Sequence, residues 1–408
     1  DQSLGNASSV SLMNTHMIKN GSNKDANVTG AFARINNKEN THVYVGKLKM
    51  SQEFEKGKIT RGFSGMLAVG KTNGNYRYDV YSIFEDDKYN PNDLGFLYSN
   101  NEIKNGLSLR YNQLTESKRF IDLETEIEIE HKSLFTDQKF VNLELEFEQK
   151  ATLKNYTTIF LRANINPYEE NDFYETRTND LLHPIKRSKS IYLGGWISTD
   201  YRKKIALDFG GGYSLKPLYE GYLYRWRIAP RFRLNDKISM RYILSIKKEY
   251  NDIGFITYDT LPLLIEPPKI DYIFAKRNTN MITNVFSLNY ILNNKMDLSI
   301  KVRYHLDQVR NIEYNKLDNN GYLYESQYVG NYDINYSTWT SDIVFNWWFS
   351  PGSQLSLVWK NGIDNTENYI TNHWIDNLNN SFKLEQQNSI SLKIIYYLDY
   401  LYFKNDKS

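Results

Sequence analysis

Hydrophobic and polar residues alternate strictly in two segments of this chain, from Ile121 to Glu130 and from Val141 to Glu148. The acidic positions of the two segments form one series: Asp122, Glu124, Glu126, Glu128, Glu130, Glu144, Glu146 and Glu148. Almost all the residues between these positions are apolar. Because successive strand residues point to opposite faces, each segment predicts a β-strand with one apolar and one charged face.

The same alternation recurs along the chain in segments separated by turn residues. It predicts about 18 strands, near residues 7–18, 26–36, 41–51, 60–71, 75–86, 102–114, 119–131, 139–152, 156–166, 189–199, 204–215, 221–234, 237–249, 280–292, 296–309, 335–349, 354–363 and 388–403. A chain built almost wholly from such strands indicates lipid on one side and water on the other. We therefore predict an all-β fold, a transmembrane antiparallel up-and-down β-barrel that occupies residues 1–408.

The connections between these strands alternate in length. Long ones are expected near 87–101, 167–188, 250–279, 310–334 and 364–387, and the others are short turns rich in Asn, Gly and Pro. Long loops then lie at one rim and short turns at the other, as in porins. The last predicted strand, 388–403, has an aromatic-ended apolar face and closes with Phe403, as is common in bacterial outer-membrane barrels.

Composition changes this prediction in only a few respects. The mean hydropathy is −0.61, and the sequence has no apolar run long enough for a membrane helix. An aromatic content of 15% suits the interfacial girdles of a barrel, although an aromatic-rich soluble β-protein such as a carbohydrate binder is the alternative. A net charge of +2 gives no argument for nucleic acid, and the absence of cysteine excludes disulfides and thiolate chemistry.

A second group of charges is basic: Arg225, Arg227, Arg231, Arg233, Arg241, Lys247, Lys301 and Arg303. If the polar faces point inward, one wall of the barrel is acidic and another is basic. Opposed walls would set a transverse field across a water-filled lumen and orient charged or zwitterionic solutes. The structural alternative is that Lys104, Arg110 and Arg162 simply neutralise the carboxylates, or that the charges bind an internal plug or a partner.

Cofactor and catalytic signals are weak. Asp86, Asp87 and Asp93 lie in a loop rich in hard oxygen ligands that could take Ca²⁺, but their spacing is not that of an EF-hand, and solvated loop residues are the alternative. The six histidines lack metal-site spacing, and no Gly-x-Ser-x-Gly motif occurs. We expect no other cofactor and no enzymatic activity.

Several phrases resemble one known family. They are Lys88–Leu97, Glu249–Ile256, Ser198–Lys203, Ala229–Asp236, Ser350–Leu355 and Tyr396–Leu401. Together they are similar to a Bacteroidota outer-membrane family of unknown function. In that family a module similar to carbohydrate-binding family 9 precedes a large barrel, and the present chain resembles the C-terminal barrel part. The resemblance implies additional N-terminal strands and a glycan-binding module in longer members.

Three functional hypotheses follow. The first is an outer-membrane channel or transport component with a charged polar lumen. The second is a structural or scaffold subunit of a multi-protein outer-membrane complex, and the third is a TonB-dependent receptor barrel. The expected location is the bacterial outer membrane, and the expected partners are its lipids, other outer-membrane or periplasmic proteins, and glycans bound through the N-terminal module.

Overall fold

One antiparallel sheet dominates the structure. The computed structural model describes residues 1–408 except 22–23, 179–180, 261–269 and 400–408. Each long strand pairs with the long strand next to it in the chain, from β2 to β22, and every described ladder is antiparallel. This is the up-and-down order that the alternating pattern predicts.

The strands of the first half are β1 (Gln2–Gly5), β2 (Ser8–Met17), β3 (Asp25–Asn36), β4 (His42–Glu55), β5 (Lys58–Lys71), β6 (Tyr76–Glu85), β7 (Glu102–Asn112), β8 (Phe120–Leu134), β9 (Phe140–Leu153), β10 (Thr158–Asn166), β11 (Glu170–Asp172) and β12 (Ile185–Arg187). The second half contains β13 (Ser190–Ser198), β14 (Ile205–Lys216), the 3₁₀ turn η1 (Pro217–Tyr219), β15 (Gly221–Arg233), β16 (Ile238–Thr260), β17 (Ile270–Asn293), β18 (Met296–Leu317), β19 (Leu323–Glu325), β20 (Ile334–Ser350), β21 (Ser353–Glu367), helix α1 (Trp374–Ser381) and β22 (Gln387–Ile395).

All eighteen predicted strands occur, and the predicted fold class is confirmed. Four short strands, β1, β11, β12 and β19, were not predicted. The predicted loops 250–279 and 310–334 are partly wrong, because β16, β17 and β18 continue into them as strands of 22 to 24 residues. Bulges between Glu249 and Asp252 and between Phe255 and Thr257 interrupt the alternation there, so the period-two pattern stops although the ladder does not.

The predicted closing strand 388–403 is too long. β22 ends at Ile395, and residues 396–399 are not in a strand. The backbone N–H of Tyr397 donates to the hydroxyl of Ser353 at 3.0 Å instead of to a ladder carbonyl, and the ring of Tyr396 stacks on Phe349. Phe403, the expected closing aromatic residue, lies outside the described residues.

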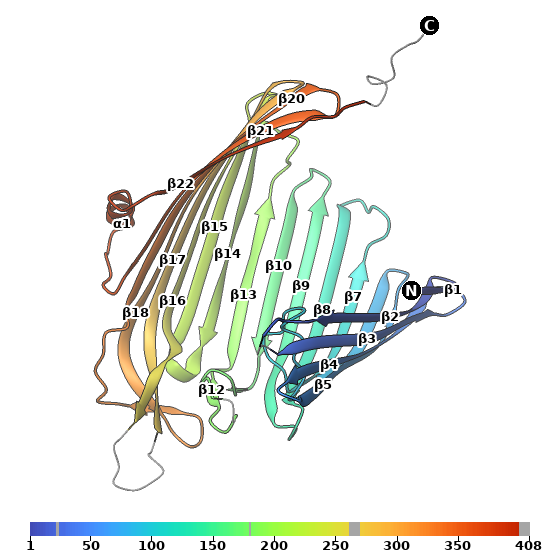
Figure 1. Ribbon diagram of the computed structural model, residues 1–408, viewed down its shortest axis with the longest axis vertical. Coiled ribbons are helices and arrows are strands. Elements are labelled where there is room, and N and C mark those ends of the chain that lie inside the picture. Colours follow the sequence, from blue (N-terminus) through green and yellow to red (C-terminus); the bar gives the residue numbers. More distant parts are fainter. Residues whose placement is uncertain (22–23, 179–180, 261–269, 400–408) are drawn as a thin grey trace.

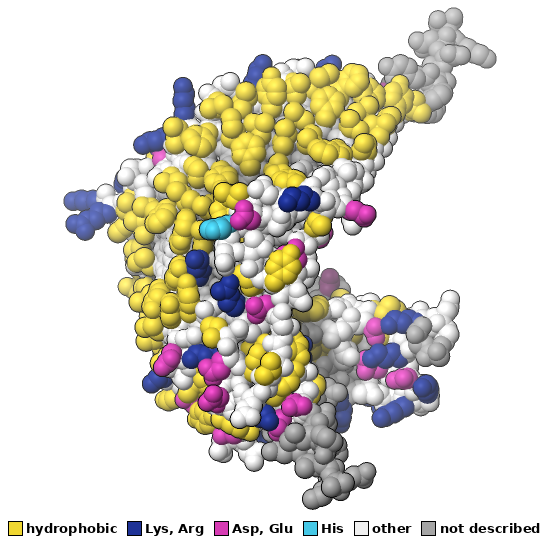
Figure 2. Space-filling model, turned by 90° about the vertical axis from the view of Figure 1, so that its left-hand side faces the viewer, with side chains coloured by type: hydrophobic (Ala, Val, Ile, Leu, Met, Phe, Trp, Pro, Cys, Tyr) yellow, Lys and Arg dark blue, Asp and Glu magenta, His cyan; other side chains and the backbone are white. Residues whose placement is uncertain are grey.

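The sheet curves into a wall whose concave side faces the viewer in Figure 1, with its middle strands farther away than its edges. Among the described residues no ladder joins β22 to β1 or β2, so β1 and β22 are the two edges of the described sheet. The convex side is apolar: hydrophobic side chains cover much of the outer surface toward the end where β20, β21 and β22 lie (Figure 2). Leu357, Ile390 and Leu392 are among the exposed apolar residues of this surface.

Helix α1 lies outside the curve of the sheet (Figure 1). It packs on β18, β20 and β21 through polar contacts: Asn335 Nδ2 donates to Asn377 Oδ1 at 2.7 Å, and the Ser337 and Ser381 hydroxyls are 3.0 Å apart. These four side chains are buried. Over the described part of the chain, no helix is long and apolar enough to cross a bilayer.

Candidate functional site: two charged stretches on one face

The eight acidic and eight basic residues of the two groups predicted from the sequence occupy one face of the sheet. The register carries this face from strand to strand: Glu126 is opposite Glu148, Glu148 opposite Arg162, and Arg162 opposite Gly194. It continues through Gly212 to Arg225, Lys247 and the basic positions of β18. We call this face the polar face. Residues of the opposite parity, such as Ile127 and Leu193, form the apolar face and are exposed.

The acidic ladder consists of Asp122, Glu124, Glu126, Glu128 and Glu130 on β8 and Glu144, Glu146 and Glu148 on β9. Three carboxylate pairs are directly opposed: Glu126 with Glu148, Glu128 with Glu146, and Glu130 with Glu144. Directly opposed like charges on neighbouring strands are destabilising unless other groups compensate for them.

Groups on the flanking strands supply this compensation. Arg110 on β7 lies 2.7 Å from Glu126, and Arg162 on β10 lies 2.6 Å from Glu146 and 3.6 Å from Glu148. The Tyr81 hydroxyl on β6 lies within hydrogen-bond distance of both Glu128 (2.9 Å) and Glu130 (2.8 Å). The predicted neutralising role therefore holds for Arg110 and Arg162. Lys104 pairs with Glu102 instead, outside the ladder.

The basic patch consists of Arg225, Arg227, Arg231 and Arg233 on β15, Arg241 and Lys247 on β16, and Lys301 and Arg303 on β18. Within it, Arg225 is opposite Lys247, and Arg231 is opposite Arg241. Asp208 on β14 serves both members of the second pair, at 3.5 Å from Arg231 and 3.1 Å from Arg241. Arg303 has its own partner, Asp342, at 2.7 Å.

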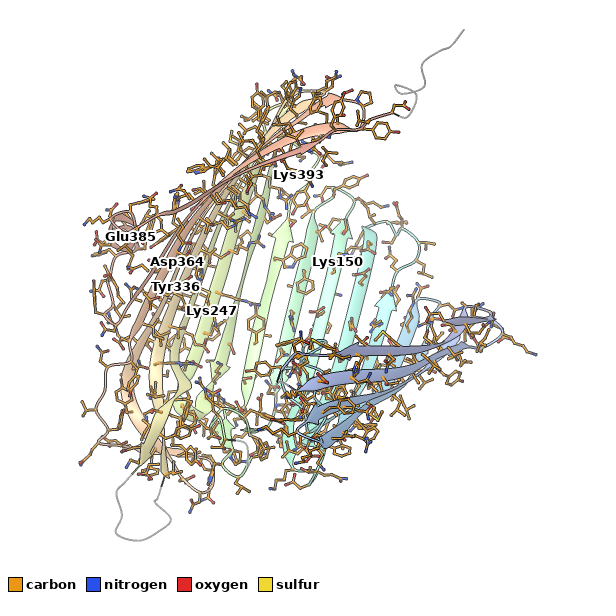
Figure 3. All side chains as sticks on the ribbon, viewed as in Figure 1. Lys150, Lys247, Tyr336, Asp364, Glu385 and Lys393 are labelled. Atoms are coloured by element: carbon orange, nitrogen blue, oxygen red, sulfur yellow. The ribbon has the colours of Figure 1, made fainter. Side chains whose placement is uncertain are left out.

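The acidic ladder and the basic patch are separated by few strands of the sheet. Only β10, β13 and β14 separate β9 from β15 in the sheet. Lys150 on β9 and Lys247 on β16, both labelled in Figure 3, mark the two stretches. A sheet in chain order keeps strands that are near in sequence near in space, so the arginines of β15 lie close to the ladder along the sheet. Lys301 and Arg303 on β18 lie three strands beyond β15.

The candidate calcium loop is held by other partners. Asp86 accepts the backbone N–H of Phe63 at 2.8 Å and of Lys88 at 3.0 Å, and Asp93 pairs with Lys19 at 2.6 Å. Asp87 lies in the same loop. Among the described residues no group of three or more His, Asp or Glu side chains is arranged to hold a metal ion.

The β11–β12 hairpin, which the sequence pattern does not predict, connects several segments at the long-loop rim. The hairpin contacts three separate segments. The Tyr174 hydroxyl donates to the Asn100 carbonyl in the β6–β7 loop. From β12, Arg187 donates to the Ile253 carbonyl of β16 at 2.7 Å, and the Lys186 N–H donates to the Gly321 carbonyl after β18 at 2.8 Å. Arg187 also pairs with Asp172 and Glu175 at 3.2 Å. Its buried apolar support is a cluster of Ile185, Ile253, Phe255, Tyr272 and Phe274.

An antiparallel up-and-down sheet with one charged and one apolar face defines a β-barrel protein of the outer-membrane type. The chain belongs to the family described as "Domain of unknown function (DUF5916)", whose family model matches residues 1–407. No curated protein matches the sequence.

Several solved structures of outer-membrane proteins are similar to this chain at low sequence identity. The siderophore receptor PirA from Acinetobacter baumannii is 8% identical, with a TM-score of 0.46 over 94% of this chain and 73% of that chain. The copper transporter OprC is 9% identical, with a TM-score of 0.37 over 88% and 76%. A loop-deletion mutant of OmpT, an outer-membrane protein of Vibrio cholerae, is 8% identical, with a TM-score of 0.30 over 88% and 95%. At these TM-scores the similarities support no conclusion about function.

Proposed function

We propose that this protein is a channel or transport component of the bacterial outer membrane, with a charged and water-filled interior. The observation that carries the proposal is the segregation of the two faces: sixteen charged side chains from five strands share the polar face, while exposed apolar residues cover the other. Ionised groups are costly in hydrocarbon, so the apolar face is the one suited to lipid.

The charges of the polar face support an aqueous path. The ladder and the arginine that pairs with it retain partial exposure: the side chains of Glu148 and Arg162 are 32% and 40% exposed. A plugged interior would require partners for these groups beyond the flanking strands. The β11–β12 hairpin, bonded to three places on the long-loop rim, is placed to narrow the path at that end.

Planar-bilayer conductance of the purified full chain tests the proposal. We expect discrete conductance steps whose ion selectivity changes when acidic-ladder residues are replaced: Glu128→Gln with Glu146→Gln should reduce cation preference, because both carboxylates border the path. Lys58→Gln, at the first residue of β5 next to the short β4–β5 turn, is the matched control and should leave selectivity unchanged. A protein that inserts, shown by heat-modifiable gel migration, but stays electrically silent contradicts the channel proposal.

A structural subunit of an outer-membrane complex is the second candidate. It is favoured by the two sheet edges, because β22 has only β21 as a described ladder partner and an open strand edge can pair with another strand. Stoichiometric co-purification with other barrel proteins, together with electrical silence, would support this candidate. We also propose that the protein originates from Bacteroidota and that a module N-terminal to this chain binds glycans. The sequence upstream of Asp1 tests the proposed module.

A further inference from the structure

A hollow of about 720 Å³ opens on the polar face over β10 and β13 to β17. Two glycines of this face, Gly194 and Gly210, line its floor, and Gly212 is the strand partner of Gly194. A Cβ atom on Gly194 or Gly212 would lie 2.2 or 2.1 Å from the hydroxyl oxygen of Tyr192. The missing side chains therefore let the Tyr192 ring lie across the floor and leave space above it.

Arg225 is fixed at one side of this floor with its charge uncompensated. The Tyr192 hydroxyl oxygen accepts hydrogen bonds from Arg225 Nε at 2.9 Å and Nη2 at 2.6 Å, and the guanidinium lies 4.8 Å from the ring centroid. Arg227 follows two residues later on the same face. Within the described residues, neither arginine has an ion pair. A tyrosine contact orients a guanidinium without neutralising it.

Arg231 and Arg241, two positive charges, share a single carboxylate. Arg231 and Arg241 are directly opposed, and Asp208 is the carboxylate between them. The Nε atoms of both arginines are buried and have no acceptor among the described groups. The other oxygen of this carboxylate, Asp208 Oδ1, accepts a hydrogen bond from the Ser198 hydroxyl at 2.8 Å.

An aromatic surface borders the floor on the other side. Trp196 is opposite Gly210, and Gly210 is opposite Arg227, so all three residues share one register row. Trp196 stacks on Phe160 at 5.6 Å between ring centroids and is 39% exposed. Two strand spacings, about 10 Å, separate the backbone positions of Trp196 and Arg227.

We propose that this hollow binds a phosphorylated sugar. The phosphate lies between Arg225 and Arg227, which have free N–H groups to donate, and the sugar ring lies over the glycine floor against Trp196. Guanidinium groups bind phosphate oxygens through charge-assisted and often bidentate hydrogen bonds, and a partly exposed aromatic ring offers an apolar face for the sugar. This proposal adds a class of solute to the proposed function. It rests on that function in one respect, which is that the polar face must be in contact with water.

Titration calorimetry on the full chain in detergent micelles tests the proposal with three probes: glucose 6-phosphate, orthophosphate and glucose. Glucose 6-phosphate should bind more tightly than either of the others. The double variant Arg225→Gln, Arg227→Gln should weaken both phosphate-bearing probes at least about tenfold. Trp196→Ala should weaken glucose 6-phosphate and leave orthophosphate unchanged. Lys47→Gln, an exposed polar-face residue on β4, is the matched control and should change nothing.

Three results would overturn the inference: equal binding of glucose 6-phosphate and orthophosphate, undiminished binding by the double arginine variant in a sample with normal heat-modifiable migration, or equal loss in the Lys47 control. Arg225→Lys with Arg227→Lys separates geometry from charge, and the proposal predicts weaker binding than in the wild type. Binding in micelles requires no conduction. An electrically silent protein that binds glucose 6-phosphate would contradict the channel proposal alone, and a conducting protein that does not bind it would contradict this inference alone.

Discussion

Arg162 on β10 is the cation that most directly compensates for the acidic residues of β9, and its replacement tests how the ladder is stabilised. Its guanidinium lies 2.6 Å from Glu146 and 3.6 Å from Glu148. Each of those carboxylates is directly opposed by another, Glu128 or Glu126 on β8. Arg162→Gln keeps a polar but shorter side chain, and it removes the charge that offsets both opposed pairs.

The magnitude follows from distance and exposure. Two unit charges about 5 Å apart interact by about 3 kcal/mol at an effective dielectric constant of about 20. Arg162, Glu146 and Glu148 have side chains that are 40%, 21% and 32% exposed, so solvent reduces this value. Fully exposed pairs contribute about 0.2–1 kcal/mol each. For two partly exposed pairs we expect Arg162→Gln to lower the free energy of unfolding by about 1.5 kcal/mol.

Urea unfolding in lipid or detergent, followed by tryptophan fluorescence at low and high salt, measures the effect. The loss should shrink at about 1 M salt, where the screening length is about 3 Å. Lys47→Gln, on the same face but without a described ion pair, should stay within about 0.5 kcal/mol of the wild type. A loss for Arg162→Gln that equals the control, or that does not depend on salt, would refute the electrostatic account of the ladder.

Three further predictions concern the helix, a turn and the rim hairpin. Asn377→Ala should cost about 1–3 kcal/mol in urea unfolding, because it removes the buried Oδ1 that accepts from Asn335, whereas Asn379→Ala on the exposed side of α1 should be near neutral. In the β13–β14 turn, hydrogen bonds from Arg202 lower the pKa of Asp200 to about 2, so Asp200→Asn should destabilise the protein above about pH 4, and the difference should vanish as the pH falls toward 2; a constant difference would contradict the assignment. Arg187→Gln should release the β11–β12 hairpin and increase the open-state conductance in bilayers, while Lys189→Gln, which has no described ion pair, should not.

The strands were predictable because a two-faced sheet imposes a period-two pattern on its sequence. Every predicted strand occurs, and the up-and-down order itself implies that the strands of the acidic ladder lie near those of the basic patch. The extensions of β16 and β17 were missed because bulges reverse which parity faces inward. Asn251, with a φ of 54°, lies within one of these interruptions.

Elements that are stabilised by contacts distant in the sequence could not be recognised from the local residue pattern. Helix α1 has a polar sequence with three asparagines, which are poor helix formers, and it is held by buried contacts to β20 such as Asn335 with Asn377. The β11–β12 hairpin consists of three-residue strands stabilised by Arg187 and by packing of Ile185 against β16 and β17. For the hollow on the polar face, the Gly210–Gly212 run was the available signal in the sequence, and its meaning depends on the pairing of Gly194 with Gly212.

The central claim is that the polar face meets water and the apolar face meets lipid, and cysteine accessibility along β8 tests it most directly. The chain contains no cysteine, so each introduced thiol is unique. Single variants at consecutive positions, Glu126→Cys, Ile127→Cys, Glu128→Cys and Ile129→Cys, would be inserted in lipid vesicles and exposed to a charged thiol reagent. The account predicts rapid labelling at positions 126 and 128 and protection at 127 and 129. Equal labelling at all four positions, or the reverse alternation, would contradict it.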